Sequence, residues 1–396
     1  MDPRIAAPGD GSPTASPTTP RTAVIVGGGI IGLATACELL RRGVDVTVAD
    51  PEPASGATRA AAGMLAPVAE VVWDQPALYP LMVESAARYP AFAARIAEAS
   101  GMDVGFLECG TLVLAGDSAD RAALTELAEL QRSLGLAAEV IGVREARTLE
   151  PSLGPGIVGA VRIPGDHQVD PRRLSAAMLA VLGDRVVRAR VTGIVRDDAG
   201  RPAGVRLDDG TTLHAEETVV AAGMGAASIE GLPEGLALPV RPVHGDVLRL
   251  AVPERLRPLA HRVIRGVVQG RPVYIVPRAD GTVVLGATSR EDDMAGVSAD
   301  GVHQLLRDAA RLVPSILECE IHEMIARARP GSPDDVPMIG RVEDGLTVSA
   351  GYFRHGILLT AVGADLTADA VCGLAPDPRF AAAVDPRRFT RKEPTE

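Results

Sequence analysis

The chain has 396 residues, 46% of them hydrophobic and 23% charged, which is the usual composition of a globular protein. Its 51 acidic residues outnumber its 40 lysines and arginines, and the formal net charge of −11 disfavours binding to nucleic acid or to an anionic membrane. No apolar run approaches the roughly 20 residues that a membrane-spanning helix requires. At about 150 residues per domain, the length predicts two or three domains.

The first ordered elements are predicted to form a β-strand, a helix and a second strand. Residues 1–21 contain too few apolar side chains to fold, so we expect a disordered arm there, with no secretory signal. The β-branched run 22–26 predicts a strand buried on both faces, and a helix is expected over 30–42. A second buried strand, 44–49, ends at Asp50, which completes a βαβ unit.

Later segments predict more strands than helices, in a mixed order that indicates an α/β protein with an antiparallel component. The predicted strands are 186–195, 204–213, 217–223, 240–250, 273–277, 282–286 and 346–351. The predicted helices are 118–135, 301–312 and 357–372. The polar end of the chain, 386–396, is expected to be a flexible tail.

A glycine-rich sequence between the first strand and helix fits the dinucleotide-binding pattern G-x-G-x-x-G. In this pattern Gly27 permits a tight turn, Gly29 lets a diphosphate approach the backbone, and Gly32 lets the helix pack closely on the strand. Asp50 then lies where an acidic side chain accepts hydrogen bonds from a ribose. Because strand, helix and acid all fall in the expected places, the sequence predicts a site for FAD or NAD.

Five further motifs follow in order and give the chain a family resemblance. They are the small-residue run 55–65, the segment 166–171, the segment 274–278 followed by 286–288, Arg329-Pro330-Gly331, and the segment 351–359. With these motifs the chain resembles the FAD-dependent amine oxidases of the D-amino acid oxidase superfamily. More narrowly, it resembles the glycine oxidases that are associated with thiamine biosynthesis.

The resemblance implies a Rossmann-like FAD-binding domain into which a substrate domain of antiparallel sheet and helices is inserted. We assign 22–75, 150–235 and 325–385 to the FAD-binding domain, and 76–149 and 236–324 to the substrate domain. The implied FAD contacts, in addition to Gly27, Gly29 and Gly32, are Ile30, Ile31, Asp50, Pro51, Ala57, Thr58, Ala62, Gly63, Met64, Val191, Tyr352, Phe353, His355, Gly356, Ile357 and Leu358.

The resemblance also implies three residues that bind and orient the substrate. Arg329 matches an arginine that grips the substrate carboxylate, and Tyr274 matches a tyrosine that lines the pocket. Arg354 matches a second arginine on the substrate side. The chain departs from the family at Arg327 and Gly225, where members often carry glycine and a nearby tryptophan, respectively. Both departures affect the expected shape of the substrate pocket rather than the cofactor.

The leading interpretation is an oxidase that deaminates glycine or a similarly small amine, such as sarcosine or D-alanine, and reduces O2 to H2O2. A dehydrogenase that passes electrons to a quinone or carrier is an alternative, as are a sarcosine oxidase with covalent flavin and a flavin-binding module without turnover. We expect no metal, because His322-Glu323 lacks the second histidine of a zinc motif. Four scattered cysteines indicate a reducing, cytoplasmic location, and the resemblance alone implies a homo-oligomer.

Overall fold

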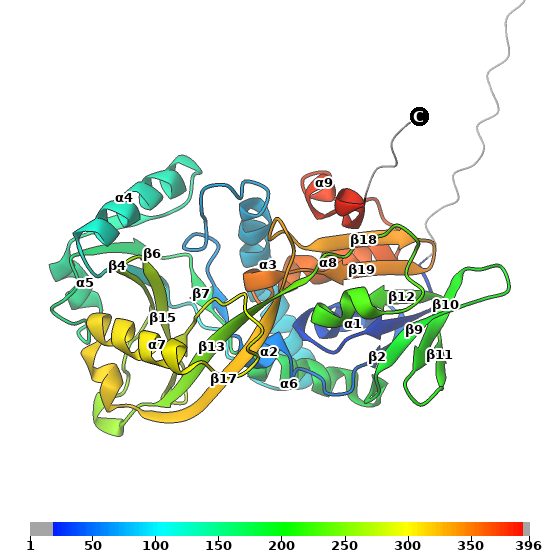
Figure 1. Cartoon of the computed structure of the whole chain (residues 1–396), viewed down its shortest axis with the longest axis horizontal. Coiled ribbons are helices and arrows are strands. Elements are labelled where there is room, and N and C mark those ends of the chain that lie inside the picture. Colours follow the sequence, from blue (N-terminus) through cyan, green and yellow to red (C-terminus); the bar gives the residue numbers. More distant parts are fainter. Residues whose placement is uncertain (1–18, 391–396) are drawn as a thin grey trace, which may run out of the picture.

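The computed structural model describes residues 19–390, in which two large β-sheets lie side by side (Figure 1). The predicted arm up to residue 18 and the tail from residue 391 lie outside the described residues. Residues 386–389 form a short 3₁₀ turn, and Arg388 within it forms an ion pair with Asp334 at 2.8 Å. None of the helices within 19–390 is long and apolar enough to cross a membrane.

The first sheet has six strands and contains the predicted βαβ unit. Its order is β18 (Met338–Glu343), β19 (Leu346–Ala350), β12 (Glu217–Val220), β1 (Thr22–Val26), β2 (Asp45–Ala49) and β8 (Val186–Val187). All neighbouring pairs are parallel except β18 and β19. Along β1, Ala23 and Ile25 belong to the core on one face, whereas Val24 and Val26 belong to the core on the other. The strand is therefore buried on both sides, as its apolar run predicts.

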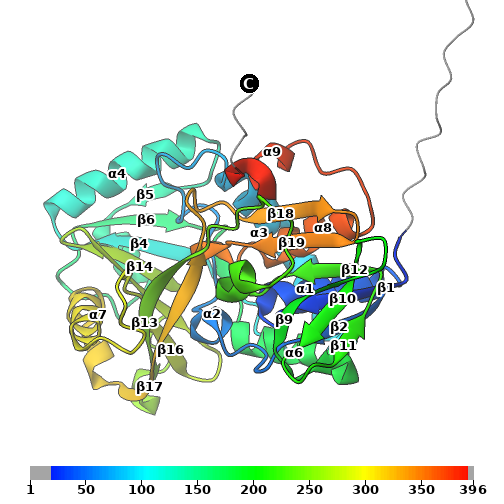
Figure 2. The same cartoon turned by 45° about the vertical axis from the view of Figure 1, so that its right-hand side comes forward.

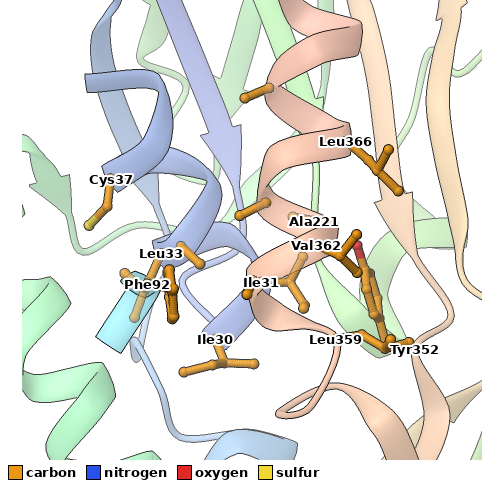
Figure 3. Close-up of a cluster of buried hydrophobic side chains, with 14 of the residues drawn as sticks. Ile30, Ile31, Leu33, Cys37, Phe92, Ala221, Tyr352, Leu359, Val362 and Leu366 are labelled. Atoms are coloured by element: carbon orange, nitrogen blue, oxygen red, sulfur yellow. The ribbon is translucent and has the colours of Figure 1, made fainter. Parts of the chain in front are cut away.

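Four helices cover one face of this sheet, and a small second sheet covers the other. The helices are α1 (Ile30–Arg41), α3 (Tyr79–Ser100), α6 (Pro171–Leu182) and α8 (Thr360–Val371). In Figure 3, Ile31 of α1 lies between this helix and α8, close to Val362 and Tyr352. The small sheet consists of β9 (Val191–Arg196), β10 (Pro202–Leu207) and β11 (Thr212–His214), all antiparallel.

The second large sheet has eight strands and is antiparallel apart from one pair. Its order is β17 (Glu320–Gly331), β13 (Arg241–Ala251), β16 (Thr282–Gly286), β15 (Arg271–Pro277), β14 (Val263–Val268), β4 (Thr111–Ala115), β6 (Gly159–Ile163) and β5 (Glu139–Ile141). The exception is the parallel pair β4 and β14. Helices α5 (Val143–Leu149) and α7 (Ala299–Leu312) share one apolar core with it, and α4 (Ser118–Ser133) packs in a separate cluster.

Short helix α2 (Ala57–Ala60) lies between the large sheets (Figure 2). Strands β3 (Met64–Leu65) and β7 (His167–Gln168) pair with each other, and α9 (Ala381–Val384), near the end of the chain, contacts β18. Helix α2 packs against β17, so the small-residue run of the first part of the chain meets the second sheet. This contact brings the glycine-rich loop and the motif around Arg329 to the same region.

The predicted fold class, a Rossmann-like part joined to an antiparallel sheet with helices, is confirmed. Three predicted elements differ in detail. The strand predicted over 204–213 is broken into β10 and β11 by a turn at 208–211. The strand predicted over 186–195 is broken into β8 and β9, because its first residues pair with β2 and its last with β10. Helix α8 begins at Thr360, after a 3₁₀ turn at 353–355, rather than near Gly356. The domain limits remain a proposal, and α3, which they place in the substrate domain, packs in the same core as α1 and α8.

Candidate active site

One cavity of about 490 Å³ runs from the glycine-rich loop to the eight-stranded sheet, and its size is typical of a ligand site. All but three of the predicted site residues line it. They are Gly27, Gly29, Ile30, Ile31, Asp50, Ala57, Thr58, Ala62, Gly63, Met64, Tyr274, Arg329, Tyr352, Phe353, Arg354, His355, Gly356, Ile357 and Leu358. Gly32, Pro51 and Val191 do not line it. Val191 is buried at the start of β9, in the core beneath the small sheet.

The glycine-rich loop has the shape that a diphosphate cradle requires. Gly27 has φ = 108°, a backbone conformation that residues other than glycine rarely adopt. A Cβ on Gly32 would overlap with the carbonyl oxygen of Gly27, so this glycine permits the close contact between α1 and the loop. A Cβ on Gly29 would meet only the hydroxyl of Thr58, at 3.7 Å. The first turn of α1, with its partial positive charge, is therefore open to a ligand at Gly29.

Asp50 is held at the carboxyl end of β2 by two backbone groups. The N–H of Gly28 donates to its Oδ2 at 2.7 Å, and the N–H of Glu52 donates to its Oδ1 at 2.8 Å. These bonds orient the carboxylate at the edge of the cavity, where its remaining lone pairs can accept hydrogen bonds. This is the geometry that a ribose hydroxyl requires of an acidic residue.

The segment after α2, residues 61–63, lines the cavity with small side chains and backbone atoms. Gly63 has φ = 77°, and a Cβ there would overlap with the carbonyl oxygen of Val169. Arg278 donates to the carbonyl oxygens of Ala62 and Val169 and to the side chain of Gln168, which fixes the segment from behind. Small side chains on a fixed backbone leave room for a flat ring system.

Phe353 faces the same cavity in a conformation that is uncommon for a bulky residue. Its φ is 47°, in the left-handed region, and such strain is often found at functional sites. The guanidinium carbons of Arg241 and Arg354 lie 5.5 and 5.0 Å from the centre of its ring, respectively, so cation–π contacts hold the side chain. This turn presents the backbone of 354–358 to the cavity.

Arg329 and Tyr274 lie at the end of the cavity formed by the eight-stranded sheet, each over a glycine. The guanidinium of Arg329 covers Gly245 of β13, and a Cβ at Gly245 would overlap with it. The ring of Tyr274 covers Gly286 of β16 in the same way. Arg329 donates to the carbonyl oxygen of Thr288 at 3.3 Å rather than to a carboxylate. Burial lowers the pKa of Arg329, but a guanidinium keeps its charge, so the group is available to an anionic ligand.

Arg265 and Glu70 form a partly buried ion pair in the cavity that was not predicted from the sequence. Burial alone would raise the pKa of Glu70, but the charge and hydrogen bond of Arg265 lower it to about 2, so the carboxylate is charged. Arg265 lies opposite Tyr274 across the hairpin of β14 and β15. The two-residue turn Gln269-Gly270 fixes the register of this hairpin and places Arg265 opposite Tyr274. The turn sequence could therefore have predicted that Arg265 lies beside Tyr274.

His355 is a further titratable side chain at this end of the cavity. It is 5% exposed, and burial lowers the pKa of its imidazole despite the opposing effect of Glu70. The ring is therefore neutral at pH 7. Arg329, Arg354 and the Arg265–Glu70 pair together leave this end with a net positive charge that suits a carboxylate.

Asp166 anchors the loop that carries Glu70. Its two oxygens accept hydrogen bonds from the N–H groups of Val68 and Ala69, at 3.0 and 2.8 Å. The carboxyl is fully buried, and burial raises its pKa to about 7. The negative charge of Glu70 also raises this pKa, whereas the two N–H groups and Arg265 lower it. The native protein therefore binds this proton more tightly than the unfolded chain, in which the group has its ordinary pKa of 3.8.

We expect the raised pKa of Asp166 to make the free energy of unfolding fall as the pH rises. Below pH 3.8 both states carry the proton, and between pH 3.8 and about 7 unfolding releases it, so the native state progressively loses its advantage. In Asp166→Asn this part of the pH dependence should disappear. Urea unfolding of both proteins between pH 5 and 8 measures it, since the difference between their free energies of unfolding isolates this group. If the free energies of unfolding of the two proteins changed with pH in the same way, the raised pKa of Asp166 would be contradicted.

A cradle for a dinucleotide that continues into a pocket with a partly buried arginine and tyrosine is typical of an oxidoreductase site. Comparison with known proteins agrees with this class. The family model described as FAD dependent oxidoreductase (DAO) matches residues 22–370. The chain therefore belongs to the FAD-dependent oxidoreductase family, and the predicted cofactor, FAD, is confirmed.

Within the family, the chain is similar to glycine oxidases over most of its length. It is 36% identical to the glycine oxidase of Geobacillus kaustophilus, over 88% of this chain and 92% of that one. A crystal structure of glycine oxidase from Geobacillus kaustophilus superposes with a TM-score of 0.82, covering 93% of this chain and 98% of the other at 34% identity. Iminodiacetate oxidase from Chelativorans sp. superposes with a TM-score of 0.81 at 28% identity, covering 92% and 98%.

A third relative is about twice as long as the match. The bifunctional protein ThiO/ThiG of Trichormus variabilis is 34% identical over 90% of this chain, but the match covers 54% of that protein. This chain therefore spans about half the length of these bifunctional relatives.

Proposed function

We propose that this chain is an FAD-dependent amino-acid oxidase that deaminates glycine or a similarly small amine, such as sarcosine or D-alanine. The observation that carries the proposal is the partly buried Arg329, whose guanidinium lies over Gly245 in the cavity that Tyr274 also lines. A planar guanidinium binds a carboxylate through two parallel hydrogen bonds, which fixes the position of Cα. The names of the glycine oxidase relatives support the same class of substrate.

The protein's residues would act by binding and orienting the amino acid. Arg329 would hold the carboxylate, with the hydroxyl of Tyr274 as a further donor and Arg354 as a second cation nearby. Such orientation accounts for several kcal/mol of the barrier, up to about 7–11 kcal/mol for well-aligned groups. FAD, when bound, supplies the acceptor for the hydrogen and electron pair that leave Cα. The resulting imine then hydrolyses in water to a keto or aldehyde acid, and releases ammonia from glycine or D-alanine and methylamine from sarcosine.

We further propose that O2 is the final electron acceptor and that the product feeds formation of the thiamine thiazole. The oxidase names of relatives and the ThiO/ThiG relatives support these two steps. The iminodiacetate oxidase relative adds N-carboxymethylglycine to the amines that need testing.

Anaerobic titration of the purified protein with each amine tests the proposal. We expect glycine to bleach the oxidised-flavin absorption band, and admission of air to restore it with formation of H2O2. Bleaching that air does not reverse would instead indicate a dehydrogenase that uses another acceptor. If no amine bleaches the band, amine oxidation is wrong.

A further inference from the structure

Arg327 lies two residues before Arg329 on β17 and lines the same cavity. Its Nε donates to the carbonyl oxygen of Ser55 at 3.0 Å, and its Nη1 donates to that of Ala326 at 2.9 Å. The guanidinium therefore lies beside the start of α2, where Gly56, Ala57 and Thr58 also line the cavity. Its Nη2 makes no hydrogen bond within residues 19–390.

The charges of the cavity single out this arginine. Four arginines line it: Arg265 is paired with Glu70, Arg329 and Arg354 lie at the end near Tyr274, and Arg327 lies beside α2. Arg59 of α2 does not line the cavity and lies 3.7 Å from Glu323. A diphosphate at the first turn of α1 would carry two negative charges, and among the described residues Arg327 is the cationic side chain at that end.

Two acidic residues line the cavity near the glycine-rich loop, Asp50 and Glu52, and neither forms an ion pair with Arg327 within residues 19–390. Both oxygens of Asp50 accept backbone N–H groups, and the hydrogen bonds of Arg327 go to carbonyl oxygens rather than to a carboxylate. The bond to Ser55 restricts the long side chain, which lowers the entropic cost of binding an anion. A fixed guanidinium with a free N–H edge is a suitable donor for a phosphate oxygen.

We infer that Arg327 binds the FAD diphosphate in this chain, and so does not simply narrow the substrate pocket. One face of β17 then serves both ligands, because side chains two residues apart on a strand point to the same side. Arg327 lies at the diphosphate and Arg329 at the carboxylate of the substrate. The inference rests on FAD as the cofactor and is independent of which amine is oxidised.

The affinity for FAD and its dependence on salt test this inference. The holoprotein is diluted, and the fluorescence of the released FAD gives Kd at low and high NaCl concentrations. We expect Arg327→Gln to raise Kd by about ten- to a hundredfold at low salt, because a charge-assisted hydrogen bond is lost. High salt screens the lost charge interaction, so the difference between the proteins should shrink as NaCl increases. Arg327→Lys, which keeps the charge, should retain part of the affinity.

Arg144→Gln is the matched control, because it removes one exposed arginine of α5 that does not line the cavity. Its Kd should equal that of the parent protein at every salt concentration. An Arg327→Gln protein whose Kd equals that of the parent overturns the inference. So does a Kd raised by the same factor at all salt concentrations, which would indicate altered packing of α2 on β17. Loss of amine oxidation by Arg327→Gln with normal FAD affinity would also overturn the inference and place Arg327 in the substrate pocket. Failure of the parent protein to oxidise any amine would contradict the proposed function and leave the FAD-affinity test of Arg327 unaffected.

Discussion

Replacing Arg329 by alanine is expected to reduce kcat/KM for glycine by about a hundredfold or more while FAD remains bound. The guanidinium lies partly buried in the cavity and donates to carbonyl oxygens rather than to a carboxylate, so its charge is available to the substrate. Its loss leaves the substrate carboxylate without this counterion in a buried site. Initial rates over a range of glycine concentrations, together with the flavin absorbance of the purified protein, measure both properties.

Arg329→Lys is the informative companion of this variant. Lysine keeps the positive charge but cannot form two parallel hydrogen bonds, so we expect an intermediate loss that falls mainly on kcat through poor orientation of Cα. If the apparent KM and kcat of Arg329→Ala match those of the parent protein, the carboxylate assignment is wrong.

Gly245→Ala should have the second-largest effect, although the changed residue need not touch the substrate. A Cβ at this position would overlap with the Arg329 guanidinium, so the guanidinium would have to move. It can move because it is the flexible end of a long side chain. We expect KM for glycine to rise about tenfold or more, since a small displacement of an orienting group is costly. The affinity for FAD should be unchanged.

Gly142→Ala provides the control for the added methyl group. Gly142 precedes α5 and has an ordinary negative φ of −72°, and a Cβ added there would have no neighbouring atom within 4 Å. This variant should keep the kinetic constants of the parent. An unchanged KM in Gly245→Ala would show that the position of Arg329 over this glycine does not matter for substrate binding.

The βαβ unit could be predicted because every signal that specifies it is local in the sequence. The apolar run of 22–26, the glycines that follow and Asp50 lie within about thirty residues. Helix α3 was not predicted, since it has proline at its start and again inside, at Pro80 and Pro90. Proline normally argues against a helix interior, and packing of this helix against α6 and α8 outweighs that preference.

The candidate site could be predicted only where a motif marks it. The family motifs pointed to Arg329, Tyr274 and the glycine-rich loop, and the structure places all of them around one cavity. The pair of Glu70 and Arg265 joins residues 195 positions apart, and no periodicity reports such a contact. The position of Arg327 beside Ser55 likewise depends on how α2 packs against β17, which is a tertiary contact. The roles of individual residues toward FAD and substrate remain predictions.

The cavity is closed by segments drawn from almost the whole length of the chain, from Gly27 to Leu358. FAD bound in this cavity would contact both large sheets, so it would bind only when both are folded and would stabilise the folded chain. By mass action, each tenfold excess of free FAD over its Kd adds about 1.4 kcal/mol to the free energy of unfolding. The thermal midpoint of this protein is therefore set by its cellular supply of flavin as well as by its sequence.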